Sequence, residues 1–246
     1  MTKIGIIGGS GLTQLRALKI TNREVLHTPY GEPSGPYATG SFDGLEVVFL
    51  PRHGAGHTIP PHQVNYRANI WGLKELGVDK VVGMAAVGGI TGHMQPGAIC
   101  IPNQIIDYTY DRKQTFFEEN HSGVTHIDFT NPYCEDMRQE LIAASRQCGI
   151  EVSTSCTYGA TQGPRLESAA EIRRMQQDGC DIVGMTGMPE TALAREIGLC
   201  YACCAVIVNW AAGKSDGPIK MEEIDENLKT GMADARKILA SLANAS

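Results

Sequence analysis

The segment Asp181–Glu190, with the sequence DIVGMTGMPE, decides the fold class. Its β-branched residues end a predicted buried strand, and a turn with two glycines follows them. Pro189 can open a helix over residues 189–197, because the N–H group that proline lacks has no partner in a first helical turn. A strand that leads through a turn into a helix is typical of α/β proteins, which bind ligands at the carboxyl ends of their strands. Met185 and Thr186 are therefore candidate ligand contacts, the alternative being an ordinary turn with a methionine in the core.

Similar units recur on both sides of this segment. The further segments predicted as strands are Lys3–Ile7, Leu45–Leu50, Lys80–Met84, Gly97–Ile101, Gln104–Asp107, the stretch Gly149–Ala160 and Leu199–Val208. Apolar periodicity and end signals predict further helices over residues 62–75, 131–147, 168–177 and 219–242, the last of these segments being either one long helix or two. The chain has 246 residues, and we find neither an internal repeat nor an interdomain linker in it. We therefore expect a single α/β domain over residues 1–246.

Charge and hydropathy argue against two classes of partner. The formal net charge is −6 and no basic cluster occurs, which argues against nucleic acid and against an anionic membrane surface. No run of 18 apolar residues could span a membrane, and the apolar start of the chain is too short for a signal peptide. We therefore expect a cytoplasmic protein with a small-molecule substrate, which can still be an anion if the local pocket opposes the net charge.

The eight cysteines are expected to be reduced and buried, since most of them lie in or beside apolar segments and no signal peptide precedes them. Cys200 and Cys203 form a lone C-x-x-C motif inside the predicted strand Leu199–Val208, without a second pair. His53 and His57 are four residues apart, but glycines and prolines around them argue against the helix that a zinc pair requires. We therefore expect no metal and no organic cofactor.

Three predicted strand ends carry groups that can bind an anion. Glycines within residues 8–11 free backbone N–H groups and Ser10 adds a hydroxyl, although a plain tight turn fits equally well. Arg52 follows a predicted strand and suits bidentate phosphate binding, with a surface salt bridge as the alternative. The small residues of Ala85–Ile90 again free backbone N–H groups. The polar stretch 111–131 is the longest predicted loop, and such loops are often lids or interface segments.

Five motifs in register are typical of one family. They are GIIGGSGL at residues 5–12, PRHG at 51–54, HTIPPHQVNYRANIW at 57–71, QGPR at 162–165 and VGMTGMPE at 183–190. Together they resemble the trimeric purine nucleoside phosphorylases, most closely the 5′-methylthioadenosine phosphorylase branch, and the resemblance extends from residue 3 to near residue 239. It implies a central mixed β-sheet flanked by helices, a homotrimer, and phosphorolysis, in which inorganic phosphate as co-substrate displaces the purine from C1′ of a nucleoside.

The implied chemistry makes three demands on the site, because the sugar becomes cationic while negative charge grows on the purine. These are a phosphate pocket against C1′, an apolar floor for the ribose and a hydrogen-bond donor for the leaving base. The resemblance implies a phosphate pocket that consists of Ser10, Arg52, His53, the backbone at Ala86, and Thr186. It also implies that Met185 lies against the ribose.

The purine end departs from the nearest branch. Methylthioadenosine phosphorylases carry aspartates at the positions of Asn209 and Ala211, and a serine at the position of Glu167. Asparagine can donate to O6 or N7 of a 6-oxopurine and glutamate can accept from its N1–H, whereas adenine has no N1–H. Asn209 and Glu167 therefore predict a 6-oxopurine, with a capping role after a strand as the alternative for Asn209. Leu166 replaces the phenylalanine that usually stacks on the base.

The 5′ end of the nucleoside is expected to meet apolar groups. Relatives that recognise a 5′-hydroxyl place a polar side chain there, whereas the matching helix start offers Met221 and Ile224, which share a face or else face the core. His126 matches a histidine that in methylthioadenosine phosphorylases reaches in from a neighbouring subunit.

The combined expectation is cleavage of S-methyl-5′-thioinosine by phosphate, which gives hypoxanthine and 5-methylthioribose 1-phosphate. Phosphorolysis of inosine or guanosine and retained activity on methylthioadenosine are the alternatives within the family. A non-catalytic nucleoside-binding protein is the alternative outside it. An intact set of phosphate-pocket residues argues against a mere binder, because such a protein has no use for phosphate.

Overall fold

Strand β5 (Lys80–Gly89) lies at the centre of the computed structural model, which describes residues 3–9, 11–12, 18–118 and 124–242. β1 (Ile4–Gly8) pairs in parallel with the first residues of β5, and β10 (Ile182–Gly184) pairs antiparallel with its last two. β11 (Cys200–Trp210) pairs in parallel with the other edge of β5 along its whole length. One long strand therefore joins the parts of a mixed sheet.

The sheet extends outward from these three neighbours of β5. Beyond β1 it continues with three strands: β4 (Leu45–Pro51), β3 (Tyr37–Phe42) and β2 (Lys19–Glu24). Beyond β10 it continues with β9 (Thr157–Ala160) and β7 (Gln104–Asp107). Two short strands branch from β11: β6 (Ile99–Cys100) and β8 (Val152–Ser153). Parallel and antiparallel pairs both occur in the described part of the chain, which confirms the predicted α/β class with a central mixed sheet.

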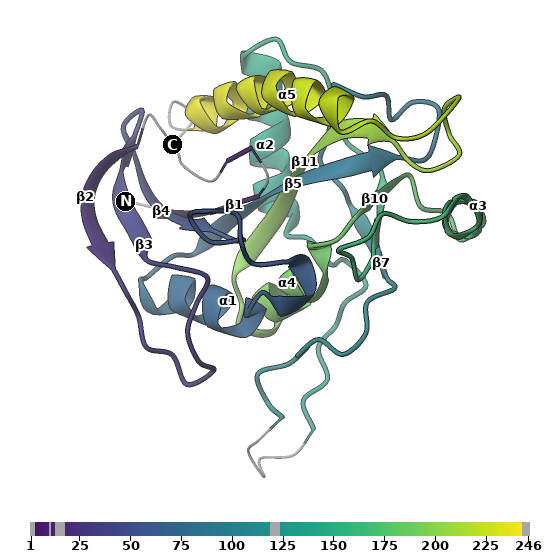
Figure 1. Ribbon diagram of the computed structural model, residues 1–246. Helices are drawn as coiled ribbons and strands as arrows, with labels where there is room; N and C mark the ends of the chain where they lie inside the picture. Colours follow the sequence, from purple (N-terminus) through teal and green to yellow (C-terminus); the bar gives the residue numbers. More distant parts are fainter. Residues whose placement is uncertain (1–2, 10, 13–17, 119–123, 243–246) are drawn as a thin grey trace.

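Helices cover both faces of the sheet (Figure 1). One face carries α1 (Tyr66–Glu75) and α4 (Gly187–Glu196), and the other carries α2 (Glu135–Gln147) and α5 (Met221–Leu242). Along β11, every second residue belongs to the core beneath α1 and α4, and the residues between them belong to the core beneath α2 and α5. A strand buried on both faces needs a continuous apolar sequence, which explains the apolar run that predicted it.

Several element boundaries differ from those predicted. α1 begins at Tyr66 rather than at residue 62, because the Asn65 side chain accepts a hydrogen bond from the N–H of Ala68 and caps the helix there. A short 3-10 turn, Pro61–Gln63, precedes it. α2 likewise begins at Glu135, after an extended Cys134, and not at residue 131. In contrast, α3 (Ala169–Gln177) follows a Ser168 capping box at the predicted position.

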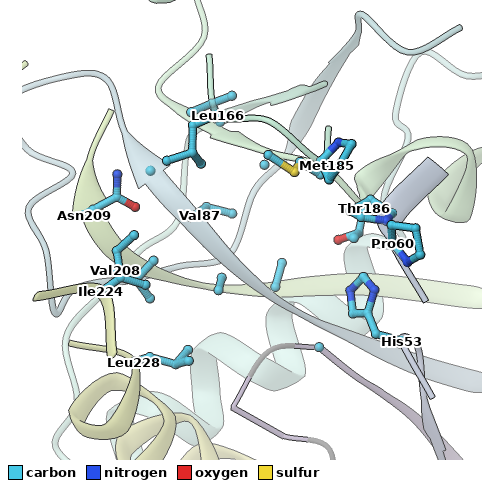
Figure 2. Close-up of a pocket in the computed structure, with 18 of the residues that line it drawn as sticks. His53, Pro60, Val87, Leu166, Met185, Thr186, Val208, Asn209, Ile224 and Leu228 are labelled. Carbon is cyan, nitrogen blue, oxygen red and sulfur yellow. The ribbon is translucent and has the colours of Figure 1, made fainter. Parts of the chain in front are cut away.

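The turn between β10 and α4, within Asp181–Glu190, has the predicted shape. β10 ends at Gly184, and α4 begins at Gly187 with one extended residue inside it, Met188 at φ −118° and ψ 140°. Extended backbone is the expected conformation before a proline, so the regular helix starts at Pro189 as predicted. The ends of β1, β4, β10 and β11 and the second half of β5 meet around one cavity (Figure 2). No helix formed by the described residues is long and apolar enough to cross a membrane.

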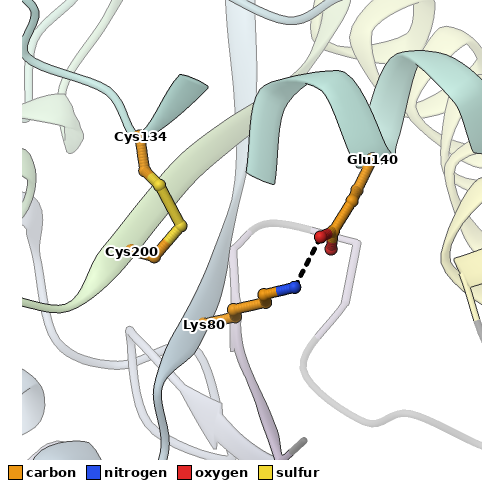
Figure 3. The surroundings of a disulfide bond; sticks show 4 residues. All are labelled: Lys80, Cys134, Glu140 and Cys200. Atoms are coloured by element: carbon orange, nitrogen blue, oxygen red, sulfur yellow. Dashed lines mark hydrogen bonds and ion pairs between the residues drawn. A yellow bond between two sulfur atoms is a disulfide. The ribbon is translucent and has the colours of Figure 1, made fainter. Parts of the chain in front are cut away.

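The disulfide Cys134–Cys200 contradicts the expectation that all eight cysteines are reduced. Cys134 precedes α2 and Cys200 begins β11, and their Cα atoms are 5.0 Å apart although 66 residues separate them (Figure 3). Beside them, Lys80 of β5 donates to Glu140 of α2 at 2.5 Å. Both contacts fasten α2 to the amino ends of β5 and β11, away from the cavity. Cys203 stays a free thiol in the core beneath α1 and α4, so the C-x-x-C pair forms no joint site.

Candidate active site

The cavity at the strand ends has a volume of about 570 Å³ and two chemically different ends. In Figure 2, His53 and Thr186 lie at one end, Leu166 and Asn209 lie at the other, and Val87 lies between them. Ten of the twelve residues proposed from the sequence line it: Arg52, His53, Ala86, Leu166, Glu167, Met185, Thr186, Asn209, Met221 and Ile224. The other two do not enter the description of the cavity. Ser10 lies outside the described residues, and His126 is exposed and does not line the cavity.

Arg52 is buried at the first end, in an ion pair that the sequence did not indicate. Its Nε and Nη2 atoms donate to the two carboxylate oxygens of Glu190 at 2.6 and 2.7 Å, and Nη1 donates to the Met84 carbonyl at 2.7 Å. Burial acts to lower the pKa of Arg52, but the Glu190 carboxylate outweighs burial and holds that pKa above its ordinary value. The surface salt bridge considered for Arg52 is therefore wrong. Arg52 is a fixed cation, and the fork of five N–H groups leaves one on each Nη atom for a ligand.

His53 is a neutral hydrogen-bonding group beside Arg52. Its Nδ1 atom lies 2.8 Å from the Ile59 carbonyl, which can only accept, so Nδ1 carries the proton and Nε2 is an acceptor. Burial first, and then the charge of Arg52, lower the pKa of His53 to about 4. At neutral pH, His53 therefore adds a lone pair to this end of the cavity and no positive charge.

Hydroxyl and backbone groups complete this end. Thr186 is the N-cap of α4 but makes no side-chain capping bond, and it lines the cavity. Ala86 belongs to the second half of β5, which lines the cavity. A Cβ atom on Gly9 would lie 2.9 Å from Nη1 of Arg52 and 2.7 Å from the Met84 carbonyl oxygen, so glycine is needed for this close approach. N–H and O–H donors gathered around a fixed guanidinium suit an oxyanion.

A bulge in β11 turns two consecutive residues toward the other end of the cavity. The register between β11 and β5 shifts between Ile207 and Asn209, so Val208 has no partner on β5. Neighbouring residues of a regular strand point to opposite faces, yet Val208 and Asn209 both line the cavity. Asn227 of α5 donates to the Val208 carbonyl at 3.0 Å, which ties the bulge to that helix. Asn209 lies inside the strand rather than after it, so the capping role considered for it is wrong.

Asn209 and Glu167 bring complementary polar groups to this end. Nδ2 of Asn209 donates to the Trp210 carbonyl at 2.7 Å, which uses one of its two N–H groups. The Thr161 hydroxyl donates to Oε1 of Glu167 at 2.6 Å and orients the carboxylate. Leu166 is 43% exposed, and its side chain points into the cavity beside Asn209 (Figure 2). An amide, a carboxylate and an apolar cover together fit a flat heterocycle that carries both acceptor and donor edges.

Arg112 is a second buried arginine, which the sequence did not single out. Its guanidinium donates to the carbonyls of Met185 at 2.9 Å, Met188 at 2.5 Å and Gln162 at 2.7 Å. These bonds join the loop after β9 to the turn after β10. Gly163 of that loop has φ +62°, and a Cβ atom there would lie 2.4 Å from the sulfur of Met185. The loop backbone therefore packs directly against Met185 and fixes it as an apolar wall of the cavity.

Replacing Arg112 with methionine is expected to lower the free energy of unfolding by about 2–4 kcal/mol, because several buried carbonyl groups lose their donor. Urea denaturation measures the loss. Arg165→Met is the matched control, since Arg165 is exposed and solvent screens its ion pair with Glu171, so its loss should change the stability far less. Equal losses in the two variants would mean that Arg112 does not hold these loops together.

The remaining side of the cavity is apolar and belongs to α5. Met221, Ile224 and Leu228 line it from the first turns of this helix, at a spacing that places them on one face. Met221 is 60% exposed, whereas Ile224 also packs against the core beneath the helix. Ile224 therefore belongs both to the cavity wall and to the core, whereas Met221 belongs to the cavity wall alone.

Comparisons with known proteins agree with this arrangement. The model of the Phosphorylase superfamily matches residues 3–244. A probable S-methyl-5′-thioinosine phosphorylase of Pseudomonas syringae pv. tomato is 52% identical over 246 residues, which are 100% of this chain and 100% of the relative. The 6-oxopurine nucleoside phosphorylase of Pyrococcus furiosus is 44% identical over 97% of this chain and 91% of its own. Among solved structures, methylthioadenosine phosphorylase from Schistosoma mansoni in complex with adenine has a TM-score of 0.95 and 33% identity, covering 100% of this chain and 91% of that chain.

Proposed function

This chain belongs to the phosphorylase superfamily, and we propose that it is a purine nucleoside phosphorylase that cleaves S-methyl-5′-thioinosine with inorganic phosphate. The products are hypoxanthine and 5-methylthioribose 1-phosphate. One observation carries the proposal: a single cavity joins an anion-binding end at Arg52 to an amide and a carboxylate at Asn209 and Glu167. The names of the relatives that act on 6-oxopurine nucleosides support the same class of substrate.

In this proposal, hydrogen phosphate binds at the first end of the cavity. The two remaining Nη–H groups of Arg52 and the Thr186 hydroxyl donate to its oxygens, while Nε2 of His53 accepts a hydrogen bond from its P–O–H group. A phosphate oxygen forms the bond to C1′ as the bond from C1′ to N9 of the purine breaks. The proton that hydrogen phosphate brings balances the one that the purine takes up, so the reaction needs no further reactant.

The purine binds at the other end, where negative charge grows in the transition state. Asn209 donates to O6 or N7 and thereby stabilises the leaving base. Glu167, oriented by Thr161, accepts from N1–H of the 6-oxopurine. Adenine would instead place an N1 lone pair against this carboxylate, and a mismatch of buried polar groups can discriminate by about 10⁴-fold. The ribose lies between the two ends, against Met185.

A panel of four nucleosides tests the substrate: adenosine, inosine and the 5′-methylthio form of each, with and without phosphate. S-methyl-5′-thioinosine is expected to have the highest kcat/KM, about tenfold or more above inosine, because apolar groups at Met221 and Ile224 favour the methylthio group over a hydroxyl. Faster cleavage of inosine would support the alternative of an inosine or guanosine phosphorylase. Faster cleavage of methylthioadenosine would reject the 6-oxopurine reading, and turnover independent of phosphate would reject phosphorolysis.

We also propose a homotrimer in which His126 completes the cavity of a neighbouring subunit. The described residues between β7 and α2, 108–118 and 124–134, include stretches that project away from the sheet (Figure 1), and they carry His126 and the exposed apolar residues Phe117 and Val124. Exposed apolar side chains on a projecting segment favour a protein interface.

His126→Ala is expected to raise the KM for the nucleoside about tenfold, because one hydrogen bond to the substrate is lost. The mass of the oligomer in light scattering should not change. His27→Ala is the matched control, because His27 is an exposed histidine on another part of the surface. A fully active monomer in solution would contradict the shared site.

The proposed reaction needs no cofactor, because phosphate itself is the nucleophile and the protein supplies the hydrogen-bond donors. We also propose a cytoplasmic location, in which the six free thiols would persist and the Cys134–Cys200 disulfide would be reduced. Mass spectrometry of alkylated protein from intact cells would check both the compartment and the state of Cys134 and Cys200.

A further inference from the structure

Glu190 is a buried carboxylate to which the proposed reaction gives no contact with substrate. It is 0% exposed, and it accepts hydrogen bonds from Nε and Nη2 of Arg52 and, at 2.7 Å, from the Tyr201 hydroxyl. Among the described residues that line the cavity, Arg52 is the only arginine or lysine. The Glu190 carboxylate therefore cancels the one permanent positive charge at the phosphate end, and neutral His53 does not restore it.

We propose that Glu190 is a positioning residue that keeps the phosphate site electrically neutral, so that bound phosphate retains its negative charge for the cationic sugar of the transition state. The inference rests on the proposed function, because it concerns the phosphate that phosphorolysis requires. The geometry supports both parts of the role. The carboxylate fixes the plane of the Arg52 guanidinium through two parallel hydrogen bonds. It leaves N–H donors on Nη1 and Nη2 for phosphate, while the Arg52–Glu190 pair as a whole has no net charge.

The neutral site affects binding and rate in opposite directions. An arginine without a counter-ion would attract phosphate equally in the ground state and in the transition state, and such uniform binding does not speed the chemical step. Attraction between phosphate and the sugar cation grows only as the transition state is reached, and it is strongest when no other cation shares the charge of phosphate. A neutral site therefore binds phosphate more weakly and reacts faster.

Glu190→Gln tests the proposal, because it keeps the shape of the side chain and removes its charge. Titration calorimetry with inorganic phosphate alone is expected to show a Kd about tenfold lower than in the wild type. Phosphate should also raise the melting temperature of the variant by more than it raises that of the wild type. Its kcat is expected to fall about tenfold or more while the KM for phosphate falls. A purely structural role would raise both Michaelis constants together, and weaker or unchanged phosphate binding overturns the proposal.

Tyr201→Phe is the matched control, since it removes one hydrogen bond from the same carboxylate and keeps its charge. Its phosphate Kd is expected to stay within about twofold of the wild type, well short of the effect of a removed charge. Tightening as large as that of Glu190→Gln would overturn the charge argument.

The folding of Glu190→Gln is itself informative. A variant that folds only in phosphate buffer supports the proposal, because the anion then replaces the missing carboxylate. If it folds in no buffer, the salt dependence of the wild type decides: a neutral site gives a phosphate Kd that changes less than about twofold between about 50 and about 500 mM KCl, and weakening of several fold overturns the proposal. Failure of the wild type to bind phosphate at all would instead reject the proposed function.

Discussion

An Arg52→Met variant is expected to raise the KM for phosphate by about 100-fold or more. The two N–H groups that Arg52 offers to the dianion are charge-assisted donors, each worth about 1.5–3 kcal/mol. The KM for the nucleoside, measured at saturating phosphate, should change far less, because Asn209 and Glu167 lie at the other end of the cavity. Steady-state kinetics with each substrate varied in turn measure the two constants.

The same substitution leaves the buried Glu190 carboxylate without its cation. Breaking a buried ion pair in this way is expected to cost about 3–5 kcal/mol of stability, so low activity alone would not locate the phosphate. The double variant Arg52→Met and Glu190→Gln separates the two effects, because it removes both charges and lets the new amide still accept from Tyr201. It should regain most of the stability but not the affinity for phosphate. Equal rises in both Michaelis constants in this double variant would remove Arg52 from the phosphate site.

Arg52 could be predicted from the local sequence, whereas its partner Glu190 could not. Arg52 was predicted because its signals are local: an apolar strand precedes it and a glycine follows two positions later. Glu190 lies 138 residues away in the chain, and only the way that β4 and α4 meet brings the two together. A glutamate in the first turn of a helix has an ordinary explanation in the helix dipole, so nothing in its position indicates a buried counter-ion. Arg112 is similar, since a single arginine in a polar loop has no periodic signal.

Strand β11 contains both a feature that the sequence predicts and one that it does not. Its apolar run predicted the strand because both faces of the sheet are covered, a requirement that acts on every residue. The bulge at Val208 has no sequence signature, yet it decides that Asn209 lines the cavity. The disulfide Cys134–Cys200 depends in the same way on topology rather than on spacing. Elements and strand-end ligand groups could thus be predicted, whereas pairings between distant residues could not.

Exchange of the two residues that contact the base is expected to invert the substrate preference. The double variant Asn209→Asp and Glu167→Ser should shift the ratio of kcat/KM between S-methyl-5′-thioinosine and methylthioadenosine by about 10⁴-fold toward the aminopurine. Serine removes the carboxylate that would face the N1 lone pair of adenine. The two single variants should each give part of the shift, because each keeps one wild-type residue, Asn209 or Glu167, that still matches one edge of the 6-oxopurine.

The surroundings of Asn209 explain why an aspartate there favours the 6-aminopurine. The Trp210 carbonyl lies 2.7 Å from Nδ2 of Asn209, so a carboxylate at this position would meet an acceptor. Two oxygens at that distance favour the protonated acid, with a pKa raised above the ordinary value of aspartate. The acid has one proton, which in the bound complex it donates to N7 of the purine rather than to the Trp210 carbonyl, while its other oxygen accepts from the 6-amino group. The exchanged site should therefore lose rate on methylthioadenosine as the pH rises through that pKa.

Leu166→Phe is the matched control for this exchange. Leu166 covers the same end of the cavity but carries no donor or acceptor. A phenyl ring in its place should therefore change kcat/KM for both nucleosides by a similar factor. Competition between the two nucleosides in one reaction, with hypoxanthine and adenine separated by chromatography, measures the ratio directly. If that ratio moves as far in Leu166→Phe as in the exchanged variant, shape rather than hydrogen bonding selects the base. If it moves in neither, Asn209 and Glu167 do not read the purine edge.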